Sequence, residues 1–157
     1  MEFDANGLEV LSCDECLALL ESQNVGRIAL SSQGLVVVLP VNYVLIDEQI
    51  VIRTRRGTRL ALATRNSIIA FEVDEIDESG QGWSVTIQGL ARELCDSPEL
   101  TVARNAPLAP WLDPIESRHV AVTIDTMSGR RVAFGSTGGS LLNHRDQGDP
   151  FSINHQS

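Results

Sequence analysis

The chain contains no lysine, and all twelve basic side chains among its 157 residues are arginine. This absence excludes a lysine Schiff base, and with it covalent catalysis through pyridoxal phosphate. It also excludes a phosphate-binding loop of the Walker type, because that loop depends on its lysine. The net charge of −9 at pH 7 argues against nucleic acid as the main partner, since a phosphate backbone requires a basic surface.

Cysteines and long apolar stretches are also scarce. Three cysteines, an odd number, provide no disulfide framework. The longest apolar run, residues 35–46, is interrupted by Pro40 and Asn42 and is too short to cross a bilayer. The first ten residues are acidic and lack the positive, apolar pattern of a signal peptide. We therefore expect a cytoplasmic protein that does not act at a membrane.

The motifs of the common hydrolases and metalloenzymes are missing. The sequence has no HExxH, no GxSxG and no EF-hand loop, and its three histidines do not cluster. We expect no metal site and identify no side chain as a clear acid or base; Asn42 and Tyr43 are the nearest candidates. If the protein is an enzyme, a bound cofactor must carry the chemistry.

Short segments of alternating polarity, separated by turns, predict a mainly β protein. Strands are expected at residues 25–32, 35–46, 50–54, 68–76, 83–94 and 119–125, with a last short one at 130–134. Small helices are expected at residues 13–23, 58–65 and 97–105, the first with Ser12 and Glu15 in capping-box spacing. This order predicts a closed six-stranded antiparallel barrel within a domain of residues 1–134. Residues 135–157 have little to bury and are expected to be disordered.

Three details of this prediction concern individual residues. Pro40 cannot donate to a sheet ladder, so it implies either a bulge or an edge position. Gly89, inside an alternating strand, suggests a sharp bend of the kind found in barrels. Ser128 and Gly129 are predicted to form a turn, and residues 1–11 a lead-in with turn signals at Asn6 and Gly7.

Residues 50–65 form a local positive region in an acidic chain, with five of the twelve arginines. The segment is typical of a strand, a tight turn at Gly57 and a helix that begins at Thr58. Free backbone N–H groups at a helix start favour an anion, and guanidinium groups match phosphate oxygens. The segment therefore predicts a phosphate site; a solvated basic turn is the alternative.

The segments VGRIAL, LPVNY, IVIRTRRGTRL, AFEVDEID, GWSVTIQGLA and SGRR occur in an order that resembles the pyridoxamine 5'-phosphate oxidase-like flavin-binding split-barrel superfamily. The likeness covers about residues 8–133 and is closest to small bacterial members with nitroreductase-like or unassigned activity. The resemblance implies a six-stranded split barrel of Greek-key type, forming a homodimer with FMN sites at the subunit interface.

The resemblance also assigns cofactor-binding residues. The strand with Val38, Leu39, Pro40, Val41 and Asn42 would run along the isoalloxazine ring. The phosphate would be held by Arg53, Thr54, Thr58 and Arg59. Trp83 and Trp111 are candidates to cover the ring, and for each tryptophan the alternative is packing in the core. Leu60 stands where the oxidases carry a lysine, and their C-terminal Arg-x-His pattern has no counterpart here. An FMN-dependent oxidoreductase acting on a small molecule other than pyridoxamine phosphate is therefore expected. A non-catalytic carrier of flavin, deazaflavin or haem is the alternative.

Overall fold

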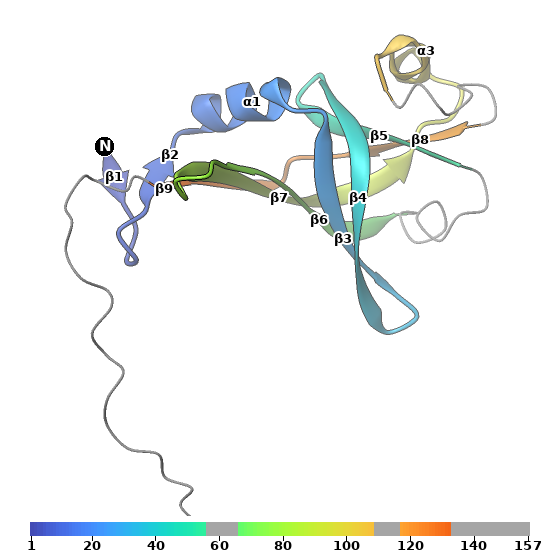
Figure 1. Cartoon of the computed structure of the whole chain (residues 1–157). Helices are drawn as coiled ribbons and strands as arrows, with labels where there is room; N and C mark the ends of the chain where they lie inside the picture. The colour runs from blue at the N-terminus through green and yellow to red at the C-terminus, as the bar shows by residue number, and fades with distance from the viewer. Residues whose placement is uncertain (56–65, 109–116, 133–157) are drawn as a thin grey trace, which may run out of the picture.

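The computed structural model describes residues 1–55, 66–108 and 117–132, which are dominated by antiparallel strands. The strands are β1 (Glu2–Phe3), β2 (Glu9–Leu11), β3 (Val25–Ser32), β4 (Leu35–Ile46), β5 (Gln49–Arg55), β6 (Ser67–Ile76), β7 (Gly82–Glu93), β8 (Ser117–Val122) and β9 (Thr126–Val132), and the helices are α1 (Cys13–Ser22) and α3 (Pro98–Asn105) (Figure 1). The predicted helix at residues 58–65 and the tail at 135–157 lie outside the described residues.

Strands β3 to β8 close into the predicted six-stranded barrel. The sheet order is β1-β2-β9-β7-β6-β3-β4-β5-β8, and a further pairing of β7 with β8 completes the ring. Strands β3, β4 and β5 follow one another through hairpins, and β6 returns to lie beside β3. The order β6-β3-β4-β5 is that of a Greek key. The prediction of a mainly β, closed antiparallel barrel is confirmed.

Gly89 allows the barrel to close. At this residue β7 changes its partner strand. Before it, β7 pairs with β9, as Gln88 does with Thr126; after it, β7 pairs with β8, as Ala91 does with Val122. The chain of Thr123 crosses so close to Gly89 that a Cβ there would overlap its backbone oxygen. The bend predicted from a glycine inside a strand is therefore present, and its cause is the close approach of two backbones.

The predicted turn at Ser128 and Gly129 is wrong, because both residues lie inside β9. Gly129 is needed there for packing: a Cβ at this position would collide with the sulfur of Cys16 on α1 and with Leu11. The chain does not reverse before β9, because β8 and β9 both run antiparallel to β7. Residues 123–125 connect them along β7, where the N–H groups of Thr123 and Asp125 donate to the backbone oxygens of Leu90 and Gln88. Gly129 therefore allows α1 to pack closely against β9 and does not form a turn.

The first eleven residues are more ordered than a lead-in. Strands β1 and β2 form a hairpin whose turn contains Asn6 and Gly7, and β2 pairs with β9, extending the sheet beyond the barrel. The Asp4 carboxylate accepts hydrogen bonds from the backbone N–H groups of Asn6 and Leu8 and pairs with Arg130 at 2.8 Å. Arg130, in the last described strand, thus fixes the N-terminal hairpin.

Both helices begin at the predicted caps. The Ser12 side chain accepts from the backbone N–H of Glu15, while the Glu15 carboxylate accepts from that of Ser12, so the capping box is complete. Ser97 caps α3 through its side chain alone, which accepts from the backbone N–H of Leu100, and Pro98 lies in the first turn. Helix α1 packs Cys16 and Leu20 into the barrel core, and α3 covers a second, smaller core on the outside of β5 and β8.

Candidate functional site

Strands β4 and β5 separate part-way along their length. They are paired over four residues of each strand, starting where Ile46 lies opposite Gln49 and ending where Tyr43 lies opposite Ile52. Beyond that point β4 continues beside β3, and β5 continues beside β8 (Figure 1). Among the described strands, residues 35–42 of β4 therefore form a sheet edge. Alternate backbone N–H and C=O groups of such an edge point away from the sheet and can meet a ligand.

This edge contains all five residues expected along a flavin ring. Leu39 and Val41 point toward the core, Val38 and Pro40 are exposed, and Asn42 is half-buried next to the point of separation. The β3–β4 register runs without a bulge through Arg27 opposite Pro40. Of the two interpretations of Pro40, the structure supports the edge position.

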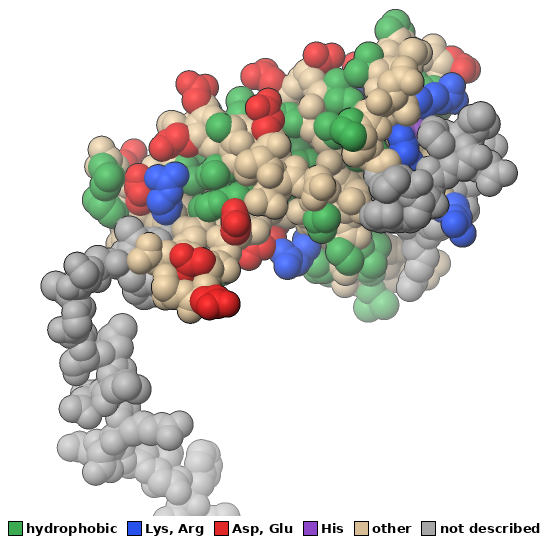
Figure 2. Space-filling view, turned by 45° about the horizontal axis from the view of Figure 1, so that its top comes forward, with side chains coloured by type: hydrophobic (Ala, Val, Ile, Leu, Met, Phe, Trp, Pro, Cys, Tyr) green, Lys and Arg blue, Asp and Glu red, His purple; other side chains and the backbone are tan. Residues whose placement is uncertain are grey.

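An apolar surface lies beside this edge, on the outside of the barrel. Pairing places its side chains on one face of four adjacent strands: Val36 and Val38 on β4, Ala29 on β3, Ile68 and Ala70 on β6, and Leu90 on β7. Val36 is 78 % exposed and Ile68 is 69 % exposed. In Figure 1, α1 and α3 lie on the other side of these strands, and hydrophobic side chains are visible along the lower edge in Figure 2. We refer to these six residues as the outer apolar face.

Tyr43, one of two candidates for an acid or base, is a structural residue. Its ring is buried and meets that of Phe71 edge to face at 4.9 Å. Its hydroxyl donates to the backbone oxygen of Leu20 at 2.6 Å, which fastens α1 to the barrel. Burial raises the pKa of Tyr43 to about 12, so the phenol stays protonated at neutral pH. Neither its position nor its pKa suits proton transfer to a ligand.

Replacing Tyr43 with phenylalanine should therefore lower stability. The ring contacts would remain, but the buried carbonyl of Leu20 would lose its donor, so the free energy of unfolding should fall by about 1–2 kcal/mol. Chemical denaturation monitored by circular dichroism would measure this change. An unchanged midpoint and slope would contradict the role of this hydrogen bond in holding α1.

Arg53 lies where β4 and β5 separate, but its guanidinium is turned into the protein. The residue is only 7 % exposed. Its Nη1 donates to the backbone oxygen of Leu108 at 2.6 Å, its Nη2 to that of Arg104 at 3.3 Å, and its Nε to Nε2 of His119 at 3.2 Å. Two of these acceptors belong to the end of α3 and the segment after it. Arg53 thus caps α3, a task that its sequence context did not indicate.

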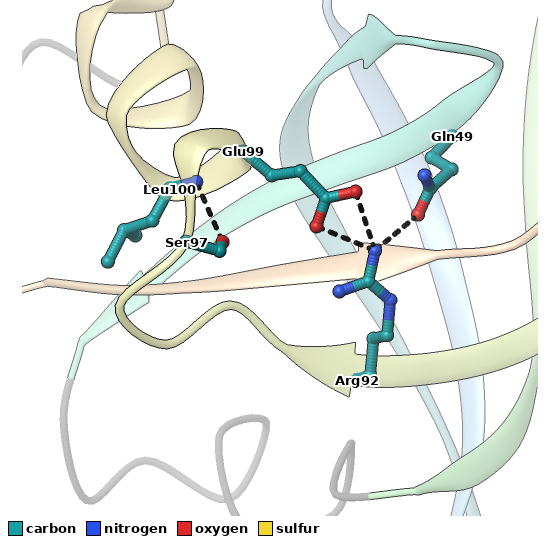
Figure 3. A network of polar contacts seen from close by, with 5 residues as sticks. All are labelled: Gln49, Arg92, Ser97, Glu99 and Leu100. Carbon is teal, nitrogen blue, oxygen red and sulfur yellow. Dashed lines mark hydrogen bonds and ion pairs between the residues drawn. The ribbon is translucent and has the colours of Figure 1, made fainter.

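A second arginine holds the start of α3. Figure 3 shows Arg92 of β7 donating from Nη2 to both carboxylate oxygens of Glu99 and to the side-chain oxygen of Gln49 on β5. Ser97, the cap of α3, lies beside this network and accepts from the backbone N–H of Leu100. Two arginines, Arg53 on β5 and Arg92 on β7, therefore fix the two ends of α3 over β5 and β8.

The other residues expected around a phosphate are placed unevenly. Thr54 is buried on the core-facing side of β5, opposite in orientation to Arg53. Thr58, Arg59 and Trp111 lie outside the described residues. Arginines nevertheless gather at this end of the molecule, whereas acidic side chains prevail at the end with α1 and the N-terminal hairpin (Figure 2). The described arginines here are Arg53, Arg55, Arg104 and Arg118.

His119 is a residue of this region that was not predicted from the sequence. It pairs directly with Arg53 across β5 and β8, and its side chain is 1 % exposed. Burial, with the nearby charges of Arg53 and Arg104, lowers the pKa of His119 from 6.5 to about 4. The ring is therefore neutral at pH 7. The alternation of residues along β8 is the sequence feature that could have indicated this position, because it puts residue 119 on the same face as Ala121, under α3.

His119 should make stability depend on pH. Because its pKa is lower in the folded than in the unfolded chain, stability is complete above pH 6.5 and falls as pH drops toward 4, where the unfolded chain binds the proton more strongly. The expected loss is about 3 kcal/mol. Denaturation at several pH values should show a steeper fall between pH 6.5 and 4 in the natural chain than in His119→Gln, which keeps only the contribution of carboxylates such as Asp4 and Glu15, whose pKa values are lowered by hydrogen bonds. Identical slopes in both proteins would contradict the assignment to His119.

Trp83 lies far from Arg53 within one chain. It is half-buried at the start of β7, where it lines a cavity of about 290 Å3 with Glu75 and Arg131 among others. His119 pairs near the other end of β7, where its backbone oxygen accepts from Leu94. Ten residues of strand span roughly 30 Å. Trp83 and Arg53 of the same chain therefore do not meet at one ligand.

Two kinds of feature are absent from the described residues. None of their helices is long and apolar enough to cross a membrane. They also hold no group of three or more His, Cys, Asp or Glu side chains arranged to bind a metal ion.

A six-stranded antiparallel barrel whose strands separate along one seam defines the class of split β-barrel proteins. The chain belongs to the pyridoxamine 5'-phosphate oxidase family, whose sequence profile matches residues 12–131. The family assignment predicted from the order of motifs is confirmed.

Individual relatives agree with this assignment. The uncharacterized protein Rv0080 of Mycobacterium tuberculosis is 32% identical over 132 residues, which cover 80% of this chain and 86% of that protein. The FAD binding protein of Mycobacterium smegmatis superimposes with a TM-score of 0.72 at 35% identity, covering 80% of this chain and 100% of that one. The FAD-binding protein of Mesorhizobium loti gives 0.68 at 26% identity, covering 79% and 96%. The similar proteins thus include flavin binders.

Proposed function

We propose that this protein is a flavin-dependent oxidoreductase whose cofactor lies in the opening between β4 and β5. The observation that carries the proposal is the edge at residues 35–42 of β4, which has no second partner among the described strands and begins beside Arg53. Backbone groups at this edge would hold the polar rim of an isoalloxazine ring. The gathering of arginines at the adjacent end of the molecule suits the negative phosphate. The residues present therefore fit a flavin.

The roles of the expected phosphate ligands differ under this proposal. Arg53 would contribute its charge and hold α3 in place, because its three nitrogens donate to the protein. Direct contacts to the phosphate would come from Thr58 and Arg59, as the family resemblance implies. Thr54 faces the core and would support the strand. No described side chain at the seam is suited to be an acid or a base, so the bound flavin would accept and pass on a hydride or two electrons.

We further propose that two chains form a homodimer through the outer apolar face. Monomeric proteins seldom leave a contiguous apolar sheet face exposed. Arg27 forms ion pairs with Glu72 at 3.3 Å and with Asp74 at 2.6 Å on the same side of the sheet, which gives the face a polar margin. A dimer would also let the Trp83 of the partner subunit approach the flavin, which the Trp83 of the same chain does not reach.

The resemblance and the similar proteins point to two different natural flavins, and the proposal rests on what these share. The resemblance implies FMN, whereas two similar proteins bind FAD. Both cofactors contain an isoalloxazine ring and a phosphate next to its ribityl chain. We propose that the seam holds this common part, with FMN as the smallest complete ligand. Deazaflavin coenzymes carry the same phosphate, whereas haem carries none.

The visible spectrum of the purified protein tests the oxidoreductase proposal. After anaerobic addition of a nicotinamide donor, the yellow colour should bleach and should return when a small organic acceptor such as a nitro compound is added. A yellow protein that the donor does not bleach would contradict an oxidoreductase that uses nicotinamide and would favour a flavin carrier. A colourless protein that takes up neither FMN nor FAD would contradict both.

A further inference from the structure

The hydrogen bonds of His119 determine where its proton lies. The Nε of Arg53 can only donate, so Nε2 of His119 must be the acceptor of the bond at 3.2 Å. A neutral imidazole carries one proton, and burial keeps this ring neutral at pH 7 by lowering its pKa. The proton therefore resides on Nδ1, which makes Nδ1 a hydrogen-bond donor.

This donor has no acceptor in the described part of the chain. Nδ1 of His119 is a buried side-chain atom without a hydrogen-bond partner, on a residue that is 1 % exposed. Buried polar groups in folded proteins nearly always have partners, so an orphaned donor calls for an acceptor from outside the described residues, and a bound ligand is one that can supply it. That group must offer an acceptor atom, which for biological ligands is most often an oxygen.

The charges around the ring indicate what kind of oxygen would be bound. The guanidinium of Arg53 touches the other ring nitrogen, and Arg104 lies near enough for its charge to lower the pKa of His119. Arg118 precedes His119 on β8, although its charge is already matched by Glu93. An oxygen with negative charge is favoured in this positive setting, and a donor buried beside arginines forms a stronger bond to it than to a neutral oxygen.

We propose that His119 is a ligand-binding residue whose Nδ1–H donates to a phosphate oxygen of the bound flavin. The inference rests on the proposed flavin function and adds a residue to it. His119 would then have a separate role for each ring nitrogen. Nε2 accepts from Arg53 and so helps to position the end of α3, while Nδ1–H donates to the ligand. Arg53 and His119 together would connect phosphate binding to the position of α3.

Two variants separate the two nitrogens. The side chain of His119→Gln can place an acceptor near the position of Nε2 but has no donor at Nδ1, whereas that of His119→Asn can place a donor near Nδ1 but does not reach Arg53. Binding of FMN and of riboflavin, which lacks the phosphate, should be measured by flavin fluorescence for each protein. Thermal unfolding of the unliganded proteins would show that each variant folds.

His119→Gln should weaken FMN binding about tenfold or more and riboflavin binding about twofold or less, because only FMN offers the phosphate oxygen. His119→Asn should retain most of the FMN affinity while it lowers the unfolding temperature. Proton NMR of the natural chain labelled with 15N-histidine should show the Nδ1–H signal moving downfield with FMN and not with riboflavin.

Other outcomes would overturn the inference. Equal losses of FMN and riboflavin affinity in His119→Gln, or no loss at all, would mean that Nδ1 does not meet the phosphate and that His119 only supports α3. An Nδ1–H signal that FMN leaves in place would mean the same. If the natural chain binds no flavin, the proposed function fails and this inference fails with it; if it binds FMN and His119→Gln binds equally well, only this inference fails.

Discussion

Replacing Gly89 with alanine is expected to lower the free energy of unfolding by about 3 kcal/mol or more. The new Cβ would overlap the backbone oxygen of Thr123, and a backbone atom cannot move away as a flexible side chain can. Thr123 is held by two hydrogen bonds to Leu90: its N–H donates to the backbone oxygen of Leu90, and its hydroxyl accepts from the N–H of Leu90. Relief of the overlap would therefore break the contact by which β7 passes from β9 to β8 and closes the barrel.

Gly34→Ala is the matched control for Gly89→Ala. Gly34 lies at the tip of the β3–β4 hairpin with a φ of 78°, and a Cβ there would meet nothing within 4 Å. Only the left-handed backbone conformation would cost energy, about 1 kcal/mol. Urea denaturation of both variants should give a much larger loss for Gly89→Ala. Equal losses would show that the approach of Thr123 is not what makes Gly89 necessary.

A glutamate on the outer apolar face should separate the proposed dimer. Ile68→Glu and Val36→Glu would each bury an unpaired carboxylate between two sheets, which costs several kcal/mol and should weaken association at least about a hundredfold. Both residues are exposed in the single chain, so its own fold should be little affected. Sedimentation velocity would measure the oligomeric state, and flavin absorbance in the same run would show whether the monomer releases its cofactor.

Val102→Glu is the control for this pair of variants. Val102 is 51 % exposed on α3, away from the outer apolar face, and is also a β-branched apolar residue. Its replacement should leave the sedimentation coefficient unchanged. If Ile68→Glu and Val36→Glu sediment like the natural chain, the two subunits do not meet through this face; if the natural chain is itself monomeric, the homodimer proposal is wrong.

Much of the barrel could be predicted because its signals are local. Turn residues on either side of the hairpin strands set the bounds of β3 and β4, and caps at Ser12 and Ser97 set the starts of both described helices. The bend at Gly89 was predicted correctly because a glycine inside an alternating strand often marks a bend or a close approach of another backbone. Each of these signals lies within a few residues of the feature that it predicts.

The sequence was least informative where a residue acts through a distant part of the chain. Gly129 stands in a strand so that Cys16, more than a hundred residues earlier, can pack against it. The guanidinium of Arg53 is directed by carbonyls of Arg104 and Leu108, which no local pattern relates to β5. His119 gains its environment from the same contact. Side-chain direction across a barrel is a tertiary property, so an arginine-rich segment alone did not reveal which arginine faces inward.

A flavin phosphate bound at the seam between β4 and β5 is the central claim, and a titration tests it directly. Protein stripped of any bound cofactor would be titrated separately with FMN, FAD and riboflavin while flavin fluorescence is followed. We predict saturable binding of FMN and FAD in proportion to the number of chains, and binding of riboflavin at least about tenfold weaker, because it lacks the phosphate. Equal affinity for riboflavin and FMN, or no binding of any of the three, would contradict the claim.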